Sequence, residues 1–323
     1  MSRSPPITVA LPTCNGARHL REALAGLRDQ AGVDFDLIVS DDRSDDDTPA
    51  LARELLGDRV RVAINPERLG LAGNWNRCVA LSRTPLVAVF HQDDVMRPGH
   101  LAAHLAAFNA DPDLGLIASA ADVIDAEGRE VPATVVGRGG CGPLDRRFAA
   151  GAFAAALAVE NPLRCSAVTI GATAHAEAGG FDPSYRYVVD WDFWLRVARR
   201  RPVAWLARPT VAVRWHPASE THRFQTGTTD LDETARLLDD LYRRDAASLN
   251  HPRGLRRRAD QRLARAYLNR AYVASKGGAP ALARRCLARS ICLSPAILGT
   301  IVLDPRLVAR LLASFVTPGP SGE

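Results

Sequence analysis

The stretch LVAVFHQDDVMRP, residues 86–98, joins an apolar run to a pair of carboxylates and then to a proline. Leu86 to Phe90 has the composition of a buried strand, and Pro98 marks the start of the next helix. Asp93 and Asp94 therefore follow the carboxyl end of a strand. Adjacent ionised carboxylates repel each other, and a divalent cation bound between them and a ligand relieves this repulsion. The pair predicts a metal site; the alternative is that the two aspartates only cap a turn or the following helix.

On both sides of this stretch, short β-rich apolar runs alternate with segments of helical periodicity. The expected strands are Ile7–Leu11, Phe35–Val39, Val60–Ile64, Leu86–Phe90 and Leu114–Ala118. The expected helices are Ala17–Gln30, Thr48–Leu56, Gly73–Ser82 and Pro98–Ala110. Such alternation is typical of parallel strands joined by crossover helices. We expect an α/β fold with helices on both faces of the sheet and a ligand crevice beyond the carboxyl ends of the strands.

The second half of the chain predicts the rest of this domain and then a helical region. Residues 122–143, rich in Gly, Asp and Pro, are interpreted as a hairpin or an active-site flap. The segments expected after it are a helix at 148–159, a strand at 167–170, a helix at 191–200, and strands at 203–206 and 210–215. The expected C-terminal helices are 231–241, 255–274, 280–293 and 305–315, before a frayed tail at 317–323. A domain change near residue 228 would divide the chain into 1–228 and 229–323.

Composition restricts the classes of protein to consider. The chain of 323 residues has a formal net charge of +5, an ordinary apolar content of 47% and no biased tract. No apolar run reaches the roughly 18 residues of a membrane-spanning helix, and Met1 to Pro6 lacks a signal-peptide core. We expect a cytoplasmic chain, which could also make peripheral contact with the inner face of the membrane. The six cysteines lack metal-ligand spacing and are expected to be reduced, mostly buried thiols.

Two further polar clusters follow predicted strands. The loop from Pro12 to Gly16 offers a hydroxyl on Thr13 and an amide on Asn15, which suit a base or a ribose, although Asn15 could equally cap a helix. Asp41 and Asp42 follow the next strand, where a carboxylate could accept a hydrogen bond from a nucleobase. Residues 45–48 are better interpreted as the cap of the following helix.

Taken together, these segments resemble the large family of nucleotide-sugar-dependent glycosyltransferases called family 2, whose α/β fold is called GT-A. The resemblance covers roughly residues 7–216. Its motifs occur in the family's order: Ala-Leu-Pro-Thr-Cys-Asn at 10–15, Ile-Val-Ser-Asp-Asp-Arg-Ser at 38–44, the segment 70–77, and His-Gln-Asp-Asp at 91–94. The resemblance implies a GT-A, Rossmann-like, mixed but mostly parallel sheet with helices on both faces, followed by the α-helical C-terminal region.

The resemblance also assigns roles in the donor site. The residues it implies for the donor nucleotide are Pro12, Thr13, Asn15, Asp41, Asp42, Asn76, Arg77, Gln92 and Asp93. Those it implies for a divalent metal, Mn²⁺ or Mg²⁺, are His91, Asp93, Asp94 and His216. The family's motif usually begins with Asp where this chain has His91, so Asp93 takes the place of the acidic ligand. An imidazole among the ligands would favour Mn²⁺ over Mg²⁺.

The segment Val189-Asp190-Trp191-Asp192-Phe193-Trp194 resembles the family's acceptor-side motif, which carries the general base. Asp190 matches the base, and Val189 replaces a carboxylate that is common there. Direct displacement by one base opposite the leaving group implies inversion. Asp192 is interpreted as structural. The Arg214-Trp215-His216 segment resembles a late family motif, with Arg214 and Arg223 as weaker candidates for phosphate contacts.

The resemblance predicts an inverting, metal-dependent glycosyltransferase in cell-surface polysaccharide or glycan assembly. Its expected partners are a UDP-, dTDP- or GDP-linked sugar and a glycan or lipid-linked acceptor, without nucleic acid. Basic C-terminal helices could contact an anionic membrane, bind a partner, or simply pack as part of the fold. One alternative is a degenerate, non-catalytic binding or scaffold protein, which the replacements at His91 and Val189 keep open. A sugar nucleotidyltransferase is less favoured, because residues 12–18 are not a basic, glycine-rich phosphate loop.

Overall fold

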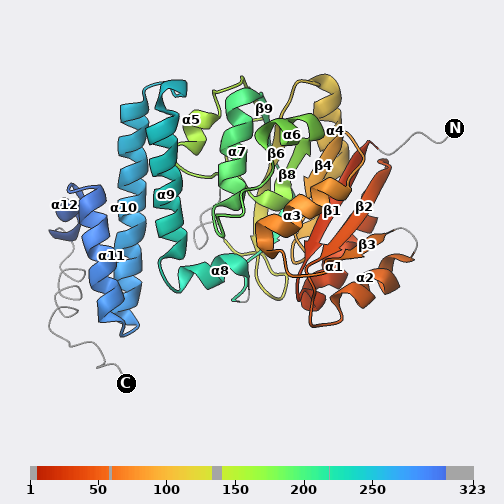
Figure 1. The fold of residues 1–323 in the computed structure, drawn as a ribbon, viewed down its shortest axis with the longest axis horizontal. Helices are drawn as coiled ribbons and strands as arrows, with labels where there is room; N and C mark the ends of the chain where they lie inside the picture. The colour runs from red at the N-terminus through yellow and green to blue at the C-terminus, as the bar shows by residue number, and fades with distance from the viewer. Residues whose placement is uncertain (1–5, 58–59, 133–139, 218, 303–323) are drawn as a thin grey trace. The chain divides into compact units, whose positions relative to one another are not determined.

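The computed structural model describes residues 6–57, 60–132, 140–217 and 219–302. Its internal contacts divide the chain into two units, Met1–Leu157 with Asn161–Ser219, and Ala158–Glu160 with Glu220–Glu323. Figure 1 shows the sheet-containing unit and the helical unit. The division between the two units thus falls between Ser219 and Glu220. The domain boundary expected near residue 228 stays a prediction.

The first unit is built on one mixed sheet. Within the described ranges its order is β3-β2-β1-β4-β8-β6-β9-β5, with β7 paired to β9. The strands are β1 Ile7–Thr13, β2 Phe35–Asp41, β3 Arg61–Ile64, β4 Leu86–Val89, β5 Val95–Met96, β6 Leu116–Ile124, β7 Arg146–Phe148, β8 Val168–Gly171 and β9 Val203–Arg214. β3, β2, β1 and β4 are parallel to their neighbours, as are β6 and β9, whereas β8 runs antiparallel to both β4 and β6. The prediction of a mixed, mostly parallel α/β sheet is confirmed.

Both faces of the sheet are covered at β1, a strand in its interior. Every residue of β1 is buried, and since alternate residues of a strand point to opposite faces, both faces of the sheet are covered. The helices of this unit are α1 Ala17–Arg28, α2 Thr48–Leu56, α3 Gly70–Leu81, α4 His100–Ala110, α5 Ala154–Leu157, α6 Ala172–Ala178 and α7 Val189–Arg200. One core cluster includes Leu11 of β1, Leu24 of α1 and Ala88 of β4, and a smaller one includes Ala10 and Val87 of the same strands.

Three predicted elements differ in the structure. Residues 203–206 and 210–215, expected as two strands, form the single strand β9, and its pairing with β6 shifts register around Ala120; the irregularity lies near Pro209, which lacks an N–H for the ladder. The helix expected at 148–159 reduces to α5, Ala154–Leu157, after the short strand β7. The predicted flap at 122–143 begins within β6 and includes a bridge between Ile124 and Glu130, and its residues 133–139 lie outside the described residues.

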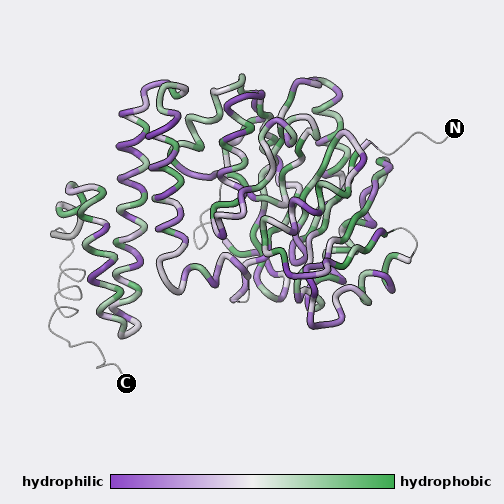
Figure 2. Tube along the Cα trace, in the orientation of Figure 1, coloured by the Kyte–Doolittle hydropathy of each residue, from purple (hydrophilic) through white to green (hydrophobic). Residues whose placement is uncertain are grey.

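The second unit is helical. It contains α8 Glu220–Gln225, α9 Thr229–Arg244, α10 Pro252–Lys276, α11 Pro280–Leu293 and α12 Ile297–Val302. The helices predicted at 231–241, 255–274 and 280–293 are therefore present, and the one predicted at 305–315 lies outside the described residues. Figure 2 shows hydrophilic and hydrophobic residues interspersed along α10. Among the described helices, none combines the length and the apolar character needed to cross a membrane.

Candidate functional site

Three loops that follow parallel strands meet at one edge of the sheet. β2, β1 and β4 are neighbours with the same direction, so their carboxyl ends lie together. The side chain of Gln92, after β4, accepts a hydrogen bond from the backbone N–H of Cys14 at 2.9 Å and donates to the Cys14 carbonyl at 3.0 Å. The backbone N–H of Asn15 donates to Ser44 Oγ at 2.8 Å. The loops predicted for the nucleoside and for the metal are thus joined side by side.

The turn after β1 has a conformation that its residues permit at little cost. Asn15 has a φ of 50°, a left-handed conformation that asparagine tolerates better than most residues. Its side-chain Oδ1 accepts the N–H of Asp45 at 2.7 Å. A Cβ at Gly16 would lie 2.0 Å from Gln92 Oε1, so a larger residue there would displace the Gln92 side chain from its hydrogen bonds with Cys14.

Asp41 holds the end of β1 and the turn after β2. Its carboxylate is completely buried, accepts the hydroxyl of Thr13 at 2.7 Å and accepts the backbone N–H of Ser44 at 2.8 Å. Oδ2 also accepts the Ser44 hydroxyl at 2.6 Å, so both oxygens have partners inside the protein and only Oδ1 retains a second lone pair. A contact from Asp41 to a nucleobase stays a prediction.

Asp42 is bound to the start of α3. Its two carboxylate oxygens accept the backbone N–H groups of Leu69 at 2.7 Å and Gly70 at 2.9 Å. These are first-turn donors without partners inside the helix, and a negative charge beside them is favourable. The predicted donor-binding role of Asp42 is untested, but its structural role at the start of α3 is clear from these bonds.

Asn74 is a buried polar residue that sequence reasoning missed. Its Nδ2 donates to the Ser40 carbonyl at 2.9 Å, and its Oδ1 accepts from Ser40 Oγ at 2.8 Å and from Asn65 Nδ2 at 3.0 Å. The signal in the sequence was an amide on the apolar face of α3, whose neighbours Ala72 and Trp75 are also buried. This network fixes α3 against β2 behind the predicted nucleoside loops.

Asp93 and His216 lie together at the metal motif. His216 Nε2 is 3.0 Å from Asp93 Oδ2. Burial acts to raise the pKa of the Asp93 carboxyl, but the hydrogen bond to His216 and the nearby imidazoles outweigh it, so the pKa lies below its ordinary value. Asp93 is therefore ionised and available to a cation. His19, which the sequence did not single out, places its ring 5.0 Å from that of His216.

Asp94 has a different environment from its neighbour. It is 2% exposed, accepts the Ser166 hydroxyl through Oδ2 and accepts the backbone N–H of Arg214 through Oδ1 at 2.8 Å. Burial raises the pKa of the Asp94 carboxyl, and the charge of Asp93 raises it further. Through these hydrogen bonds Asp94 links the metal motif to Ser166 and to β9.

His91 places a ring nitrogen near one of the aspartates, since its Nδ1 lies 3.7 Å from Asp94 Oδ2. Its backbone N–H donates to Ser166 Oγ at 3.1 Å, and its ring stacks on Trp75 with centroids 5.3 Å apart. Its Nε2 is buried and has no hydrogen-bond partner among the described residues. Burial lowers the pKa of the imidazole, which favours the neutral form that binds metals.

The cluster fits a divalent cation. His91, Asp93 and Asp94 each offer a ligand atom, and these atoms lie within 4.8 Å of one another. His216 borders the same place through its contact with Asp93. An imidazole nitrogen together with carboxylate oxygens is a donor set that transition-metal ions accept. The structure thus brings three of the four residues predicted for the metal together and places the fourth, His216, next to Asp93.

Asp190 approaches this cluster from the start of α7. Its Oδ2 accepts the side-chain amide of Asn161 at 3.2 Å. Burial raises the pKa of the Asp190 carboxyl, while the neighbouring Trp191 N–H and His91 act in the opposite direction. The same carboxylate helps to raise the pKa of the Cys165 thiol, after burial. Asp190 is therefore a half-buried carboxylate whose charge acts on His91, although the two are far apart in the sequence.

Asp192 follows the structural interpretation. Its carboxylate forms a 2.6 Å ion pair with Arg196 one turn later in α7, instead of facing the cluster. The indole of Trp191 donates to the Leu157 carbonyl at 2.8 Å, and the buried side chains of Phe193 and Trp194 belong to the core.

Arg214 is a correction to the sequence interpretation, which offered it as a phosphate contact. Its guanidinium is 1% exposed, donates through Nε to the Asp93 carbonyl at 2.8 Å, and donates through Nη1 to the Asp125 carbonyl at 3.0 Å. Nη2 pairs with Glu22 of α1. Arg214 thus links the metal motif to the loop after β6 and to α1. Because its donors already have acceptors within the protein, it does not serve as a phosphate contact. Arg223, the other candidate, is exposed and pairs with Glu220 at 2.7 Å in the second unit.

The two donor residues predicted in α3, Asn76 and Arg77, have different surroundings. The side-chain amide of Asn76 pairs with the backbone of Phe181, accepting its N–H and donating to its carbonyl, both at 2.8 Å. Arg77 is exposed on α3. The donor roles of Asn76 and Arg77 stay predictions.

Comparisons with known proteins support the assignment of the fold. S. aureus TarS 1-349 in complex with UDP-GlcNAc has a TM-score of 0.64 at 14% identity and covers 96% of this chain and 89% of its own. The mannosyltransferase PcManGT from Pyrobaculum calidifontis in complex with GDP-Man and Mn²⁺ has a TM-score of 0.57 at 16% identity, with coverage of 98% and 87%. Both likenesses show the GT-A fold.

Several curated relatives match the sequence. An uncharacterized protein of Mycobacterium tuberculosis is 28% identical over 72% of this chain and 75% of its own length. The GalNAc(5)-diNAcBac-PP-undecaprenol beta-1,3-glucosyltransferase of Campylobacter jejuni is 31% identical over 30% of this chain, and the match spans 33% of that protein. The model of glycosyl transferase family 2 matches residues 8–153, which hold β1 to α4 and the metal motif. Residues 8–153 therefore match the glycosyltransferases of family 2, within a chain whose fold is of the GT-A type.

Proposed function

We propose that this protein transfers a sugar from a nucleoside-diphosphate donor to a hydroxyl acceptor with inversion, and that the reaction depends on a divalent metal. The observation that carries the proposal is the position of His91. Its pKa responds to the charges of both Asp93 and Asp190, so a metal-binding carboxylate and a candidate base border the same imidazole. A donor diphosphate on one side and an acceptor hydroxyl on the other is the arrangement that direct displacement requires.

The nucleoside of the donor would bind over the joined loops after β1 and β2. Pro12, Thr13, Asn15, Asp41 and Asp42 are the residues proposed for it, whether the nucleotide is UDP, dTDP or GDP. Support for a nucleotide-sugar donor comes from the fold neighbours, which were solved with UDP-GlcNAc and with GDP-Man. Asn76, Arg77 and Gln92 are proposed at the border of this site.

The metal, Mn²⁺ or Mg²⁺, would be held by Asp93 with His91, His216 or Asp94. When bound there, such an ion supplies positive charge that neutralises the leaving diphosphate. The chain's own contribution is to keep Asp93 ionised through His216 and to hold the motif in place through Arg214 and Ser166. Because a ring nitrogen is present, Mn²⁺ is the preferred candidate.

Asp190 would act as the general base. Its carboxylate would take the proton of the acceptor hydroxyl as that oxygen attacks the anomeric carbon. Burial raises the pKa of Asp190, which makes the carboxylate a stronger base than an exposed aspartate. Asn161 holds one of its oxygens at 3.2 Å and so orients the group. Attack from the side opposite the leaving diphosphate gives inversion.

The acceptor is proposed to be a glycan or lipid-linked saccharide in cell-surface polysaccharide assembly. Support comes from the C. jejuni relative, whose name specifies an undecaprenol-linked acceptor. We place the reaction at the cytoplasmic face of a membrane, with residues 1–228 as the catalytic domain and residues 229–323 as a helical region that makes peripheral membrane contact.

The experiment is a thermal-shift and turnover screen of the purified protein with UDP-, GDP- and dTDP-sugars, with and without Mn²⁺. We expect one donor to raise the melting temperature only with metal, because a ligand bound to the native state stabilises it by mass action. We also expect slow metal-dependent hydrolysis of that donor. A protein that binds no donor with metal present would instead be a degenerate, non-catalytic relative.

A further inference from the structure

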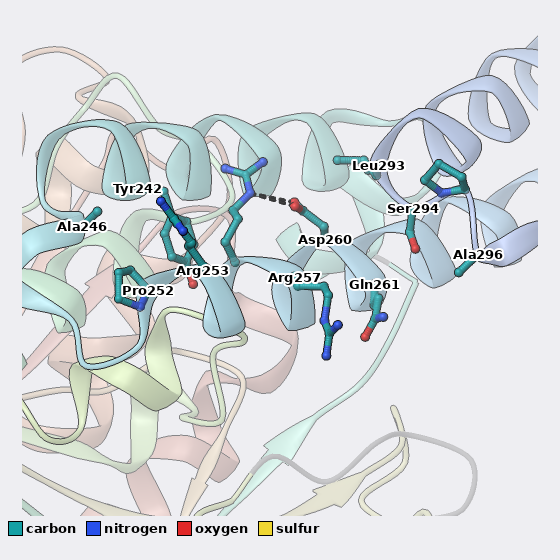
Figure 3. Close-up of a pocket in the computed structure, with 12 residues that line it drawn as sticks. Tyr242, Ala246, Pro252, Arg253, Arg257, Asp260, Gln261, Leu293, Ser294 and Ala296 are labelled. Carbon is teal, nitrogen blue, oxygen red and sulfur yellow. Dashed lines mark hydrogen bonds and ion pairs between the residues drawn. The ribbon is translucent and has the colours of Figure 1, made fainter.

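The helical second unit contains a groove outside the site described above. Its volume is about 770 Å³, and it lies between the end of α9, the start of α10 and the turn after α11. Figure 3 shows Tyr242, Pro252 and Ala246 at one end and Leu293, Ser294 and Ala296 at the other. The lining is mainly apolar, but Arg253, Arg256 and Arg257 border it. A concave apolar surface edged by cations is suited to an amphiphilic anion.

The three arginines differ in their partners. Arg256 is neutralised, because its guanidinium pairs with Asp260 at 2.8 Å and with Asp239 at 2.7 Å; Figure 3 marks the first of these pairs. Arg253 and Arg257 are exposed, and within the described ranges no carboxylate pairs with either. The groove therefore has two uncompensated guanidinium groups one turn apart on α10.

The surroundings of the groove favour a surface over a small soluble anion. α10 carries a single acidic residue, Asp260, in its 25 residues, and that residue is used by Arg256. The helix also exposes Arg265 and Lys276 farther along. Beyond the groove, Leu298 of α12 is 46% exposed. A basic helix with one acidic residue, in a unit that also exposes an apolar side chain, is suited to an anionic bilayer.

We propose that the groove binds the phosphate headgroup of an anionic phospholipid, with Arg253 and Arg257 on the phosphate. Guanidinium groups donate paired hydrogen bonds to phosphate oxygens. The apolar lining, which includes Tyr242, Pro252 and Ala296, would cover the glycerol and the first methylenes, whereas inorganic phosphate would gain nothing from it. The inference deepens the membrane contact of the proposed function and rests on it for its setting, but it does not depend on the transferase site.

The test is co-sedimentation of the full chain with vesicles of phosphatidylcholine alone or of phosphatidylcholine and phosphatidylglycerol in equal amounts. Binding is expected only to the anionic vesicles. The variant Arg253→Gln/Arg257→Gln should weaken it about twentyfold, because it removes the paired hydrogen bonds that the two guanidinium groups donate to the phosphate as well as their charge. Arg265→Gln/Lys276→Gln removes the same charge from the same helix without changing the groove. It should weaken binding by less than about threefold, because it removes only non-specific attraction that salt screens.

Each other outcome overturns the proposal in a recognisable way. Equal losses in the two double variants would mean that the whole basic face acts without the groove. Absence of vesicle binding would exclude a lipid ligand. So would a rise in melting temperature with inorganic phosphate alone that is lost in Arg253→Gln/Arg257→Gln. Donor-induced thermal stabilisation is measured on the same samples: if it persists while vesicle binding fails, only the lipid site is wrong, and if the reverse holds, only the proposed transferase function is wrong.

Discussion

His216 Nε2 lies 3.0 Å from Asp93 Oδ2, although the two residues are 123 positions apart in the sequence. The sheet explains this proximity. β5 pairs antiparallel with β9, with Val95 opposite Ala212, so the residues just before β5 lie next to those just after the end of β9. The two-residue strand β5 thereby brings the late His216 to the early metal motif.

Asp93→Asn is expected to abolish the Mn²⁺-dependent part of donor stabilisation, because it removes the ionised carboxylate proposed as the metal ligand. His216→Ala should weaken apparent Mn²⁺ affinity by about tenfold to a hundredfold, the usual effect of losing a group that supports a metal ligand. The measurement is a thermal-shift titration with Mn²⁺ at saturating donor. Asp29→Asn, which removes an exposed carboxylate at the end of α1, serves as the matched control. Unchanged metal dependence in Asp93→Asn would mean that Asp93 is not a ligand.

Asp190→Asn should leave the donor dissociation constant close to that of the wild type while lowering the transfer rate by about 10²- to 10⁴-fold, the range for loss of a general base. The matched control is Asp192→Asn on the same helix, whose carboxylate pairs with Arg196; it should retain transfer. Donor binding by calorimetry and product formation by chromatography separate the two effects. Loss of donor binding in Asp190→Asn would assign this residue a structural role instead.

Arg214→Lys should destabilise the first unit by about 2–3 kcal/mol, because a lysine cannot replace the guanidinium bonds to Asp93, Asp125 and Glu22 and leaves buried acceptors without donors. All five tryptophans of the chain lie between residues 75 and 215, so their fluorescence during urea unfolding reports on this unit. Arg83→Lys, at an exposed position, should change the midpoint very little. A similarly small change in Arg214→Lys would show that the buried contacts contribute little.

The buried histidines His100 and His104 should make the first unit less stable as the pH falls below 6.5, whereas the raised pKa of Asp94 acts in the opposite direction. Burial lowers the pKa of His100 from its ordinary 6.5 to about 3 and lowers that of His104 as well. Between these values the unfolded state binds a proton that the folded state excludes, so stability decreases as the pH falls through this window. His100 alone should cost about 2 kcal/mol by pH 5.

Urea midpoints measured from pH 8 to pH 5 test this expectation. The His100 and His104 rings lie 4.0 Å apart, and each bonds a threonine hydroxyl, Thr210 and Thr169 respectively. His104→Gln should flatten the pH dependence because it removes one of the two titrating groups. A pH dependence identical to that of the wild type would mean that His104 titrates normally in the folded protein.

Much of the fold could be predicted because local patterns reflect it. The apolar runs at β1, β2 and β4 and the periodic segments at α1 and α2 are features of neighbouring residues. The antiparallel strand β8 between β4 and β6 could not be assigned its place, since pairing partners distant in the chain leave no local mark. The split of β9 into two strands was wrong because Pro209 interrupts the pattern while the ladder continues around it.

The candidate site divides in the same way. The motifs around Asp41 and Asp93 were visible because a few residues of distinctive chemistry follow predicted strands, and the one around Asp190 was visible because the segment 189–194 resembles a family motif. The supporting residues Asn74, Ser166 and Arg214 were missed or misassigned, because a polar residue in an apolar segment does not reveal whether it faces solvent or a buried partner. For Arg214 the difference is decisive, since burial among carbonyl groups removes it from the phosphate site.

The sequence by itself determined the family, the strand-and-helix alternation and the aspartates that carry the proposed chemistry, since these depend on residue type and short spacing. Only the tertiary structure decided that Asp93 is paired with His216, that Asp94 is buried between Ser166 and Arg214, and that Asp190 lies near His91. The physical reason is that ionisation and metal affinity depend on burial and on charges within a few ångströms, and sheet pairing brings those neighbours together from distant parts of the chain.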